Sequence, residues 1–135
     1  MKNKKEIKVG VIGVGRGMSF AKYCVHAGFK LVAICDQWKE KLDEAAKTYN
    51  VKTYTDYDKF LKHDMDAVIL ANFFDQHAPF AIKALKAGKH VMSETSCNAT
   101  LAEGVELCRT VEETGLIYML AENYPYTKFN QEMRK

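Results

Sequence analysis

Short apolar runs alternate along the chain with longer stretches in which apolar and charged positions recur at helical spacing. The apolar runs predict strands over residues 7–13, 30–36, 52–55, 66–71, 90–94 and 116–121. The amphipathic stretches predict helices over residues 16–27, 39–49, 79–87 and 101–114, with a further short helix that carries Phe60 and Leu61. The run DAVILA at residues 66–71 is almost entirely apolar, which is typical of a strand covered on both faces.

Residues that favour helix ends support these boundaries. Gly28 and Gly88 follow two of the expected helices, where a left-handed cap residue is common. Asp56 precedes the short helix and is expected to be its N-cap. Thr100 and Glu103 have the spacing of a capping box, which predicts a helix start at residue 101.

Strands that alternate with helices predict an α/β fold, a parallel sheet with helices on both faces. Right-handed crossovers favour a doubly wound sheet of the Rossmann type, for which the strand order 3-2-1-4-5-6 is the usual arrangement. The length of 135 residues predicts a single domain with a core large enough to be stable without disulfides.

The first expected strand runs into the segment GVGRGMS, residues 13–19. A tight glycine turn between a strand and a helix lets backbone N–H groups approach a phosphate, and the helix N-terminus adds a favourable field. Gly13 and Gly15 occupy the first two positions of the G-x-G-x-x-G pattern, whereas Met18 stands at the third and Gly17 lies one residue early. The incomplete match alone is a weak signal, and an ordinary tight turn is the alternative.

Asp36 strengthens the case for a dinucleotide site, because it ends the next expected strand about 20 residues after Gly15. A carboxylate at that place binds ribose hydroxyls and repels a 2′-phosphate, which favours NAD over NADP, although it could also be a helix cap. The basic residues Arg16 and Lys39 leave NADP as an alternative cofactor. Arg16 could face either the pyrophosphate or solvent. Trp38 could cover the adenine or be a half-buried helix residue.

Six segments of the chain share a pattern with one family: KVGVIGVGRG, AICD, YTDYDKFL, DAVILAN, HAPFAIKALKAGKHVMSE and AENYPY. On these segments the chain resembles the N-terminal domain of the Gfo/Idh/MocA oxidoreductases, related to glucose–fructose oxidoreductase and inositol dehydrogenase. The resemblance extends over nearly the whole chain. It implies that this domain binds NAD or NADP, and that a second α+β domain brings a sugar, cyclitol or related polyol as substrate.

The resemblance also implies roles for individual residues. It would put Asn72, Phe73 and His77 near the cofactor, and Glu94, which matches the first position of the family's E-K-P motif, beside the nicotinamide ribose. Asn123 could bind the substrate or the nicotinamide amide. The alternatives are a turn residue for Asn72, a helix residue without a ligand for His77, and a cap residue for Asn123.

The E-K-P motif is interrupted, because Thr95 replaces the family's lysine and Ser96 its proline. A threonine hydroxyl cannot act as the base that takes the alcohol proton without strong activation. His77 has a suitable ordinary pKa for that role, and Glu94 and Tyr124 are weaker candidates. The catalytic residues are therefore unknown.

The last residues, YTKFNQEMRK, predict a helix that begins near the end of the chain. We expect residues 1–124 to form the dinucleotide-binding domain and residues 125–135 to start a connecting helix. The chain is then a fragment that lacks the C-terminal α+β domain and is inactive alone. The alternatives are a non-enzymatic dinucleotide-binding module and a structural subunit with an empty fold.

Composition and charge limit the classes of partner that the chain is expected to bind. The formal net charge is only +3, and Lys2, Lys4 and Lys5 belong to an expected solvated tail. The other lysines are interleaved with acidic residues, so no basic stripe suited to nucleic acid is present. The sequence has no apolar stretch long enough to span a membrane and no signal-peptide pattern.

The four cysteines form no C-x-x-C pair, so we expect no zinc or other metal site. Free thiols are typical of a reducing compartment, which predicts a cytoplasmic protein. Neither the substrate nor the oligomeric state follows from the sequence, and a homo-oligomer is left open.

Overall fold

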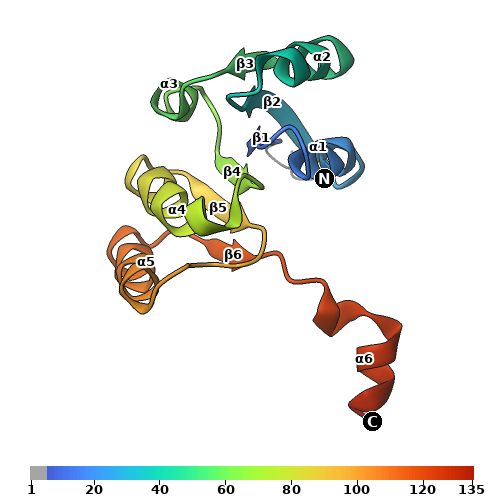
Figure 1. Cartoon of the computed structure of the whole chain (residues 1–135), viewed down its shortest axis with the longest axis vertical. Coiled ribbons are helices and arrows are strands. Elements are labelled where there is room, and N and C mark those ends of the chain that lie inside the picture. The colour runs from blue at the N-terminus through green and yellow to red at the C-terminus, as the bar shows by residue number, and fades with distance from the viewer. Residues whose placement is uncertain (1–5) are drawn as a thin grey trace, which may run out of the picture.

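The computed structural model describes residues 6–135, and the expected lysine-rich tail lies outside them. The strands within this range form one parallel sheet in the order β3-β2-β1-β4-β5-β6 (Figure 1). Their bounds are β1 Ile7–Ile12, β2 Phe29–Cys35, β3 Lys52–Tyr54, β4 Ala67–Leu70, β5 His90–Ser93 and β6 Tyr118–Leu120. The α/β class and the predicted strand order are confirmed.

Helices connect the strands as the amphipathic stretches predict. Their bounds are α1 Gly17–His26, α2 Lys39–Tyr49, α3 Tyr57–Leu61, α4 His77–Lys86, α5 Leu101–Thr114 and α6 Lys128–Met133, with 3₁₀ turns η1 Phe74–Gln76 and η2 Tyr124–Tyr126. Helix α4 begins two residues before the predicted start at Pro79, directly after η1.

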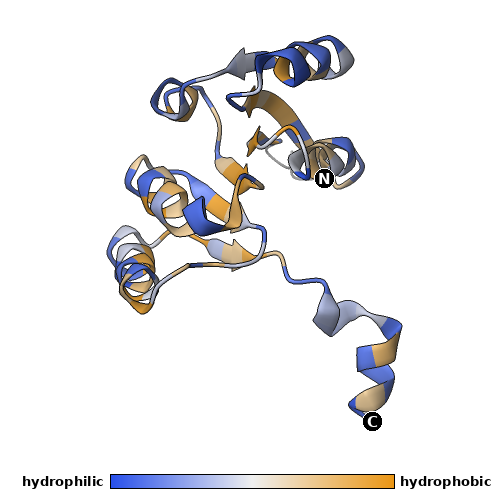
Figure 2. Cartoon of the chain, in the orientation of Figure 1, coloured by the Kyte–Doolittle hydropathy of each residue, from blue (hydrophilic) through white to orange (hydrophobic). Residues whose placement is uncertain are grey.

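The sheet separates two hydrophobic cores, one for each layer of helices. Alternate strand residues point to opposite faces, so Val68 and Leu70 belong to the core under α3, α4 and α5, whereas Ile69 belongs to the core under α1 and α2. Figure 2 shows the hydrophobic residues on β1 and β2 and the largely hydrophilic surface of α2. Burial on both faces explains why the β4 run is apolar throughout.

Side-chain caps fix two of the helix starts as predicted. Oδ1 of Asp56 accepts hydrogen bonds from the backbone N–H groups of Asp58 and Lys59, and these bonds, with the Lys59 one foremost, lower the pKa of the carboxyl group. Thr100 and Glu103 form the complete capping box at the start of α5. These caps place α3 and α5 against the sheet at defined residues.

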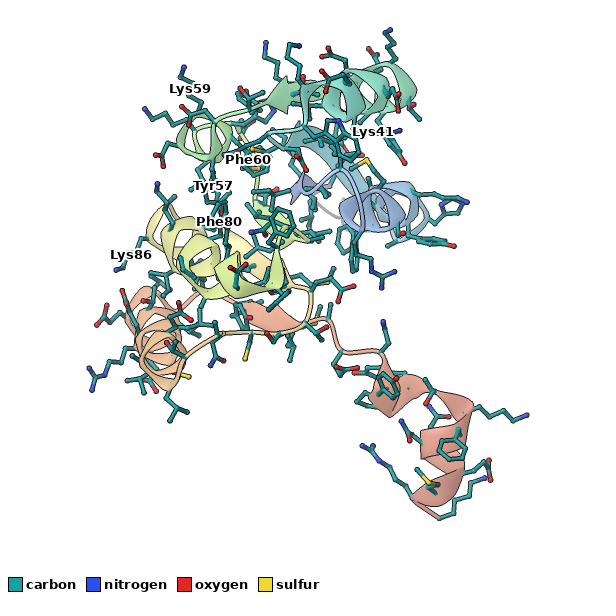
Figure 3. All side chains as sticks on the ribbon, viewed as in Figure 1. Lys41, Tyr57, Lys59, Phe60, Phe80 and Lys86 are labelled. Atoms are coloured by element: carbon teal, nitrogen blue, oxygen red, sulfur yellow. The ribbon has the colours of Figure 1, made fainter. Side chains whose placement is uncertain are left out.

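An aromatic cluster joins α3 to α4. The rings of Tyr57 and Phe80 lie with centroids 4.4 Å apart, and Phe60 stacks on Tyr57 from the same helix (Figure 3). The Tyr57 hydroxyl donates a hydrogen bond to the Phe80 carbonyl (O···O 2.9 Å), and burial raises its pKa well above the ordinary value. This contact holds the two helices together across the sheet edge where the strands end.

The C-terminal part of the chain is more open than predicted. The last strand is three residues long instead of the expected run 116–121, because β6 is an edge strand that pairs only with β5. Helix α6 projects away from the sheet (Figure 1) and exposes Phe129 and Met133. Among the described residues, no helix is long and apolar enough to cross a membrane.

Candidate cofactor site

A cavity of about 560 Å³ lies where β1, β2 and β4 end. Its walls are the residues that follow these strands, together with side chains of α3, η1 and α4. In an open parallel sheet this edge, where the chain order reverses between β1 and β4, is the usual ligand site. The predicted residues Gly13, Gly15, Asp36, Asn72 and Phe73 all line the cavity.

Gly13 and Gly15, the first two glycines of the turn, are glycine for different structural reasons. Gly13 has φ +102°, and a Cβ there would lie 2.3 Å from the Ala71 carbonyl oxygen, so a side chain is excluded. A Cβ on Gly15 would meet no atom within 4 Å, so this residue faces open space in the cavity wall. The protein itself does not require glycine at residue 15, whereas a ligand phosphate close to the backbone would.

The third glycine of the turn is Gly17. A Cβ at Gly17 would lie 2.9 Å from Cγ1 of Val11 and 3.2 Å from the Ile12 carbonyl oxygen, so only glycine lets α1 begin this close to β1. The G-x-G-x-x-G pattern puts Met18 at its third position and Gly17 one residue too early. The structure corrects this, because the packing role belongs to Gly17 and the turn is one residue shorter.

Asp36 holds the glycine turn against the end of β2. The Val14 N–H donates to its Oδ2 (N···O 2.7 Å), and the Trp38 N–H donates to its Oδ1 (2.8 Å). Each carboxylate oxygen accepts more than one hydrogen bond, so the group can still receive two ribose hydroxyls. Asp36 thus has a structural role in the turn in addition to its predicted role in binding.

Asn72 follows β4, and its side chain fits a cavity that binds a polar group. Its side-chain nitrogen and oxygen are both shielded from solvent, and neither has a hydrogen-bond partner within residues 6–135. Buried amides are almost always paired, because an unmade hydrogen bond costs about 1–3 kcal/mol. Since Asn72 lines the cavity, a polar group bound there would satisfy it. Phe73, next in the chain, is 75% exposed at the same wall.

Several cavity residues were not singled out from the sequence. They follow strand ends or begin helices, and they include Gln37, Thr55, Tyr57, Gln76 and Phe80. The places of Gln37 and Thr55 just after β2 and β3 could have indicated these two residues. Trp38 also lines the cavity; it is 59% exposed and precedes α2, so it is not a half-buried helix residue.

The buried thiol of Cys35 belongs to the cavity wall as well. Burial, reinforced by Asp36 and Asp56, raises the pKa of Cys35 to about 12. The thiol therefore stays protonated at neutral pH and is no nucleophile.

Arg16 connects the glycine turn to the end of β5. Its Nε donates to Oε1 of Glu94, and its guanidinium lies 5.3 Å from the centroid of the Phe20 ring. The Glu94 side chain is 12% exposed, whereas that of Arg16 is 53% exposed. Burial raises the pKa of Glu94, but the bonds from Arg16 and from the Thr95 N–H outweigh burial, and the net pKa is lowered.

His77 is buried, with 1% of its surface exposed, and does not line the cavity. Its Nδ1 lies 2.8 Å from the Ser96 carbonyl oxygen, and its Nε2 lies 3.3 Å from the Asn72 carbonyl oxygen. Both ring nitrogens thus face protein backbone. This geometry favours a structural role for His77 over the role of a base that meets a substrate.

Residues 94–98 follow β5 and include the departures from the E-K-P motif. Thr95 is exposed, and its backbone N–H donates to Oε2 of Glu94 (N···O 3.0 Å). Sγ of Cys97 donates to Oδ1 of Asn98, and Nδ2 of Asn98 donates to the Thr100 carbonyl. Asn98 therefore organises the approach to α5.

Asn123 and Tyr124 lie apart from the cavity, in the segment that leads from β6 to α6. Asn123 is exposed and precedes η2, and Tyr124 is 72% exposed. The structure does not bring either residue to the other predicted site residues. Within residues 6–135, no group of three or more histidine, cysteine or acidic side chains is arranged to hold a metal ion.

The sheet, the glycine turn and the acid after β2 together define a dinucleotide-binding Rossmann domain. Residues 7–122 match the family model described as "Oxidoreductase family, NAD-binding Rossmann fold", the Gfo/Idh/MocA family. The chain belongs to this family, which confirms the resemblance and the cofactor class.

Similar proteins include enzymes with different names. A "Glycosyl hydrolase family 109 protein" of Shewanella baltica is 32% identical over 89% of this chain. The crystal structure of myo-inositol 2-dehydrogenase from Lactobacillus plantarum superposes with a TM-score of 0.89 at 25% identity over 96% of the chain. The crystal structure of scyllo-inositol dehydrogenase from Lactobacillus casei, with bound NAD(H) and scyllo-inositol, superposes with a TM-score of 0.88 at 26% sequence identity over 96% of the chain.

The chain is much shorter than these relatives. It spans 29% of the length of the Shewanella protein and 40% of each inositol dehydrogenase chain. The similarity therefore concerns the dinucleotide-binding part of these proteins.

Proposed function

We propose that this chain is the NAD(P)-binding domain of an oxidoreductase that transfers a hydride between the nicotinamide and a sugar, cyclitol or related polyol. The observation that carries the proposal is the cavity lined by the glycine turn, Asp36 and the unpartnered Asn72 amide. The inositol dehydrogenases and the glycosyl hydrolase among its relatives have names that refer to polyols or glycosides. These names give no support to a non-enzymatic module.

The binding mode follows the cavity from one strand end to the next. The turn at Gly13 and Gly15 is assigned to the pyrophosphate, and Asp36 is assigned to the hydroxyls of the adenosine ribose. Asn72 and Glu94, after β4 and β5, are assigned to the nicotinamide half. Bound NAD would supply a hydride acceptor at nicotinamide C4, and this chain's residues would hold it in place.

The chain's own residues supply a weak proton route. The Thr95 hydroxyl would need strong activation to act as a base, both nitrogens of His77 face backbone carbonyls, and the carboxylate of Glu94 is paired with Arg16. We propose that residues 1–124 bind the cofactor, that residues 125–135 begin the connection to a substrate domain, and that the proton acceptor lies outside this chain. Free cysteines support a cytoplasmic location.

A second candidate function is a nicotinamide-dependent glycosyl hydrolase. Relatives from Shewanella strains, 32% and 34% identical, are named glycosyl hydrolase family 109 proteins. Glycosidases that depend on NAD exist as a mechanistic class, so an NAD-binding fold and a glycosidase name are compatible. Both candidates place a carbohydrate next to the nicotinamide.

One assay on the full protein that the gene encodes separates the two candidates. A dehydrogenase accumulates NADH, measured by absorbance, in proportion to the polyol consumed. A hydrolase releases p-nitrophenol from a nitrophenyl glycoside while NADH does not accumulate. If Asp36→Ala leaves either activity unchanged at limiting NAD, or if neither activity needs NAD, the proposed function is wrong.

A further inference from the structure

His77 joins two loops that end adjacent strands. β4 and β5 pair in parallel, with Leu70 opposite Ser93, so Asn72 and Ser96 leave the sheet at the same edge. The imidazole lies between them, 2.8 Å from the Ser96 carbonyl oxygen and 3.3 Å from that of Asn72. Because the ring is buried, these contacts are shielded from water.

The two contacts are unequal. A neutral imidazole carries one N–H, so it can donate to only one of two carbonyls. The 2.8 Å contact of Nδ1 lies within the ordinary range for an N–H···O bond, whereas the 3.3 Å contact of Nε2 lies beyond it. We therefore assign the proton to Nδ1, which makes the bond to Ser96 the stronger one.

The residues that His77 connects are the ones assigned to the nicotinamide half of the cleft. Asn72 presents an unpartnered amide in the cavity wall. Glu94 precedes Ser96 by two residues, and its N–H donates to the Leu70 carbonyl (N···O 2.8 Å), so the loop has one backbone anchor on each side of Thr95. The His77 bond is the second of these anchors.

We propose that His77 is a positioning residue for the nicotinamide half of the dinucleotide. By anchoring the Ser96 carbonyl to the start of α4, five residues after Asn72, it sets the direction of the Asn72 amide and of the Glu94 carboxylate. It has no contact with the cofactor itself and makes no contribution to the adenosine half, where Asp36 and the glycine turn are held by other bonds. This inference rests on the proposed function.

The test compares NADH with ADP-ribose, which lacks the nicotinamide, by calorimetry on the 135-residue chain. His77→Leu removes the Ser96 bond and should weaken NADH by about tenfold while changing ADP-ribose little. His77→Asn places an amide nitrogen near the position of Nδ1 and should restore most of the loss. His77→Gln reaches toward the position of Nε2 and should not. His26→Leu, at an exposed histidine on α1, is the matched control.

Three results would overturn the proposal. They are an equal loss of NADH and ADP-ribose binding in His77→Leu, no loss of either, or equal rescue by Asn and Gln. If His77→Leu does not fold, Asn72→Ala decides: it must weaken NADH and spare ADP-ribose, and equal effects on both contradict the proposal. If the unmodified chain binds neither ligand, the proposed function itself fails, which distinguishes that failure from the others.

Discussion

At the proposed adenosine end of the cleft, the domain's own hydrogen bonds hold the binding side chain: both oxygens of Asp36 accept backbone N–H groups, one of them from the glycine turn. At the proposed nicotinamide end, the Asn72 amide has no partner among the described residues, and Glu94 depends on the half-exposed Arg16. The difference indicates that the domain is preorganised for one half of a dinucleotide. The other half is held by groups that a ligand must satisfy.

The two ends of the cleft also differ in how closely other elements of the fold surround them. The proposed adenosine end is lined by Trp38 before α2, by Tyr57 of α3 and by Phe80 of α4, and the last two rings lie with centroids 4.4 Å apart. Beyond the proposed nicotinamide end lie the edge strand β6, the turn η2 and the projecting α6, which expose Met119, Tyr126 and Phe129 respectively (Figure 1). Hydride transfer requires reactants held about 3–3.5 Å apart, and residues 6–135 form no second wall at this end to provide that positioning.

The largest effect is expected at the glycine turn, where both halves meet. Gly15→Val should weaken NAD binding by more than about a hundredfold, because the side chain would occupy the open space assigned to the pyrophosphate. The fold should persist, since a Cβ at residue 15 meets no protein atom within 4 Å. Calorimetry measures the binding, and thermal unfolding measures the stability.

Gly13→Ala is the contrasting control for that prediction. Its φ of +102° and the close Ala71 carbonyl should lower the free energy of unfolding by at least about 2 kcal/mol. If Gly15→Val unfolds the domain as Gly13→Ala does, or binds NAD normally, the pyrophosphate is not at this turn.

Asp36→Ala tests the preorganised end. The loss of charge-assisted hydrogen bonds to the ribose should weaken NAD binding by about 1–3 kcal/mol. Part of that loss should be structural, because the Val14 N–H also loses its acceptor. A titration with ADP-ribose should show the same loss as one with NAD. A loss of affinity confined to NAD would show that Asp36 does not act at the adenosine end of the cleft.

Arg16→Ala tests the weaker end and has a smaller effect. Without Arg16, its hydrogen bond and its charge no longer lower the pKa of Glu94, so that pKa should rise, which an NMR titration can follow. A lowered carboxyl pKa contributes stability that is present above the unfolded-state value and is lost as pH falls through the folded-state value. The variant should therefore be less stable by about 0.5 kcal/mol at pH 7, and the difference should close as pH falls below about 4.

The control for that prediction is Lys39→Ala, which removes the exposed Lys39–Asp43 pair on α2. It should leave the pKa of Glu94 unchanged. If Arg16→Ala also leaves that pKa unchanged, the ion pair does not form in solution.

The smallest effect is expected for Thr95→Lys, which should not change the activity of the chain. Thr95→Lys restores the family's lysine, yet the 135-residue chain should oxidise no sugar or polyol with or without it, because the substrate has no second wall. An NADH-absorbance assay over a panel of polyols measures this. Clear turnover by the unmodified chain would show that residues 94–98 belong to a complete active site.

The fold follows from the sequence because its signals are local. The apolar run of β4, the Asp56 cap and the capping box at Thr100 each act within a few residues, and each is confirmed. The β6 strand was predicted too long, because its length depends on a single neighbouring strand. The role of Gly17 was missed, because it depends on the distance to Val11 across the helix–strand contact.

The candidate site is less predictable because it is built from distant residues. Arg16 and Glu94 are 78 positions apart, and neither the short motif nor the spacing indicates that they pair. The burial of His77 and the unpartnered amide of Asn72 likewise appear only when β4, β5 and α4 are assembled. The assignments of these residues to the cofactor therefore stay predictions that binding measurements must test.

The most direct test of the account is a calorimetric titration of this chain with NAD and with NADP at the same ionic strength. The account predicts one saturable site for NAD and weaker binding of NADP, because the Asp36 carboxylate repels a 2′-phosphate. Absence of saturable NAD binding, or NADP binding as tight as NAD, would contradict it.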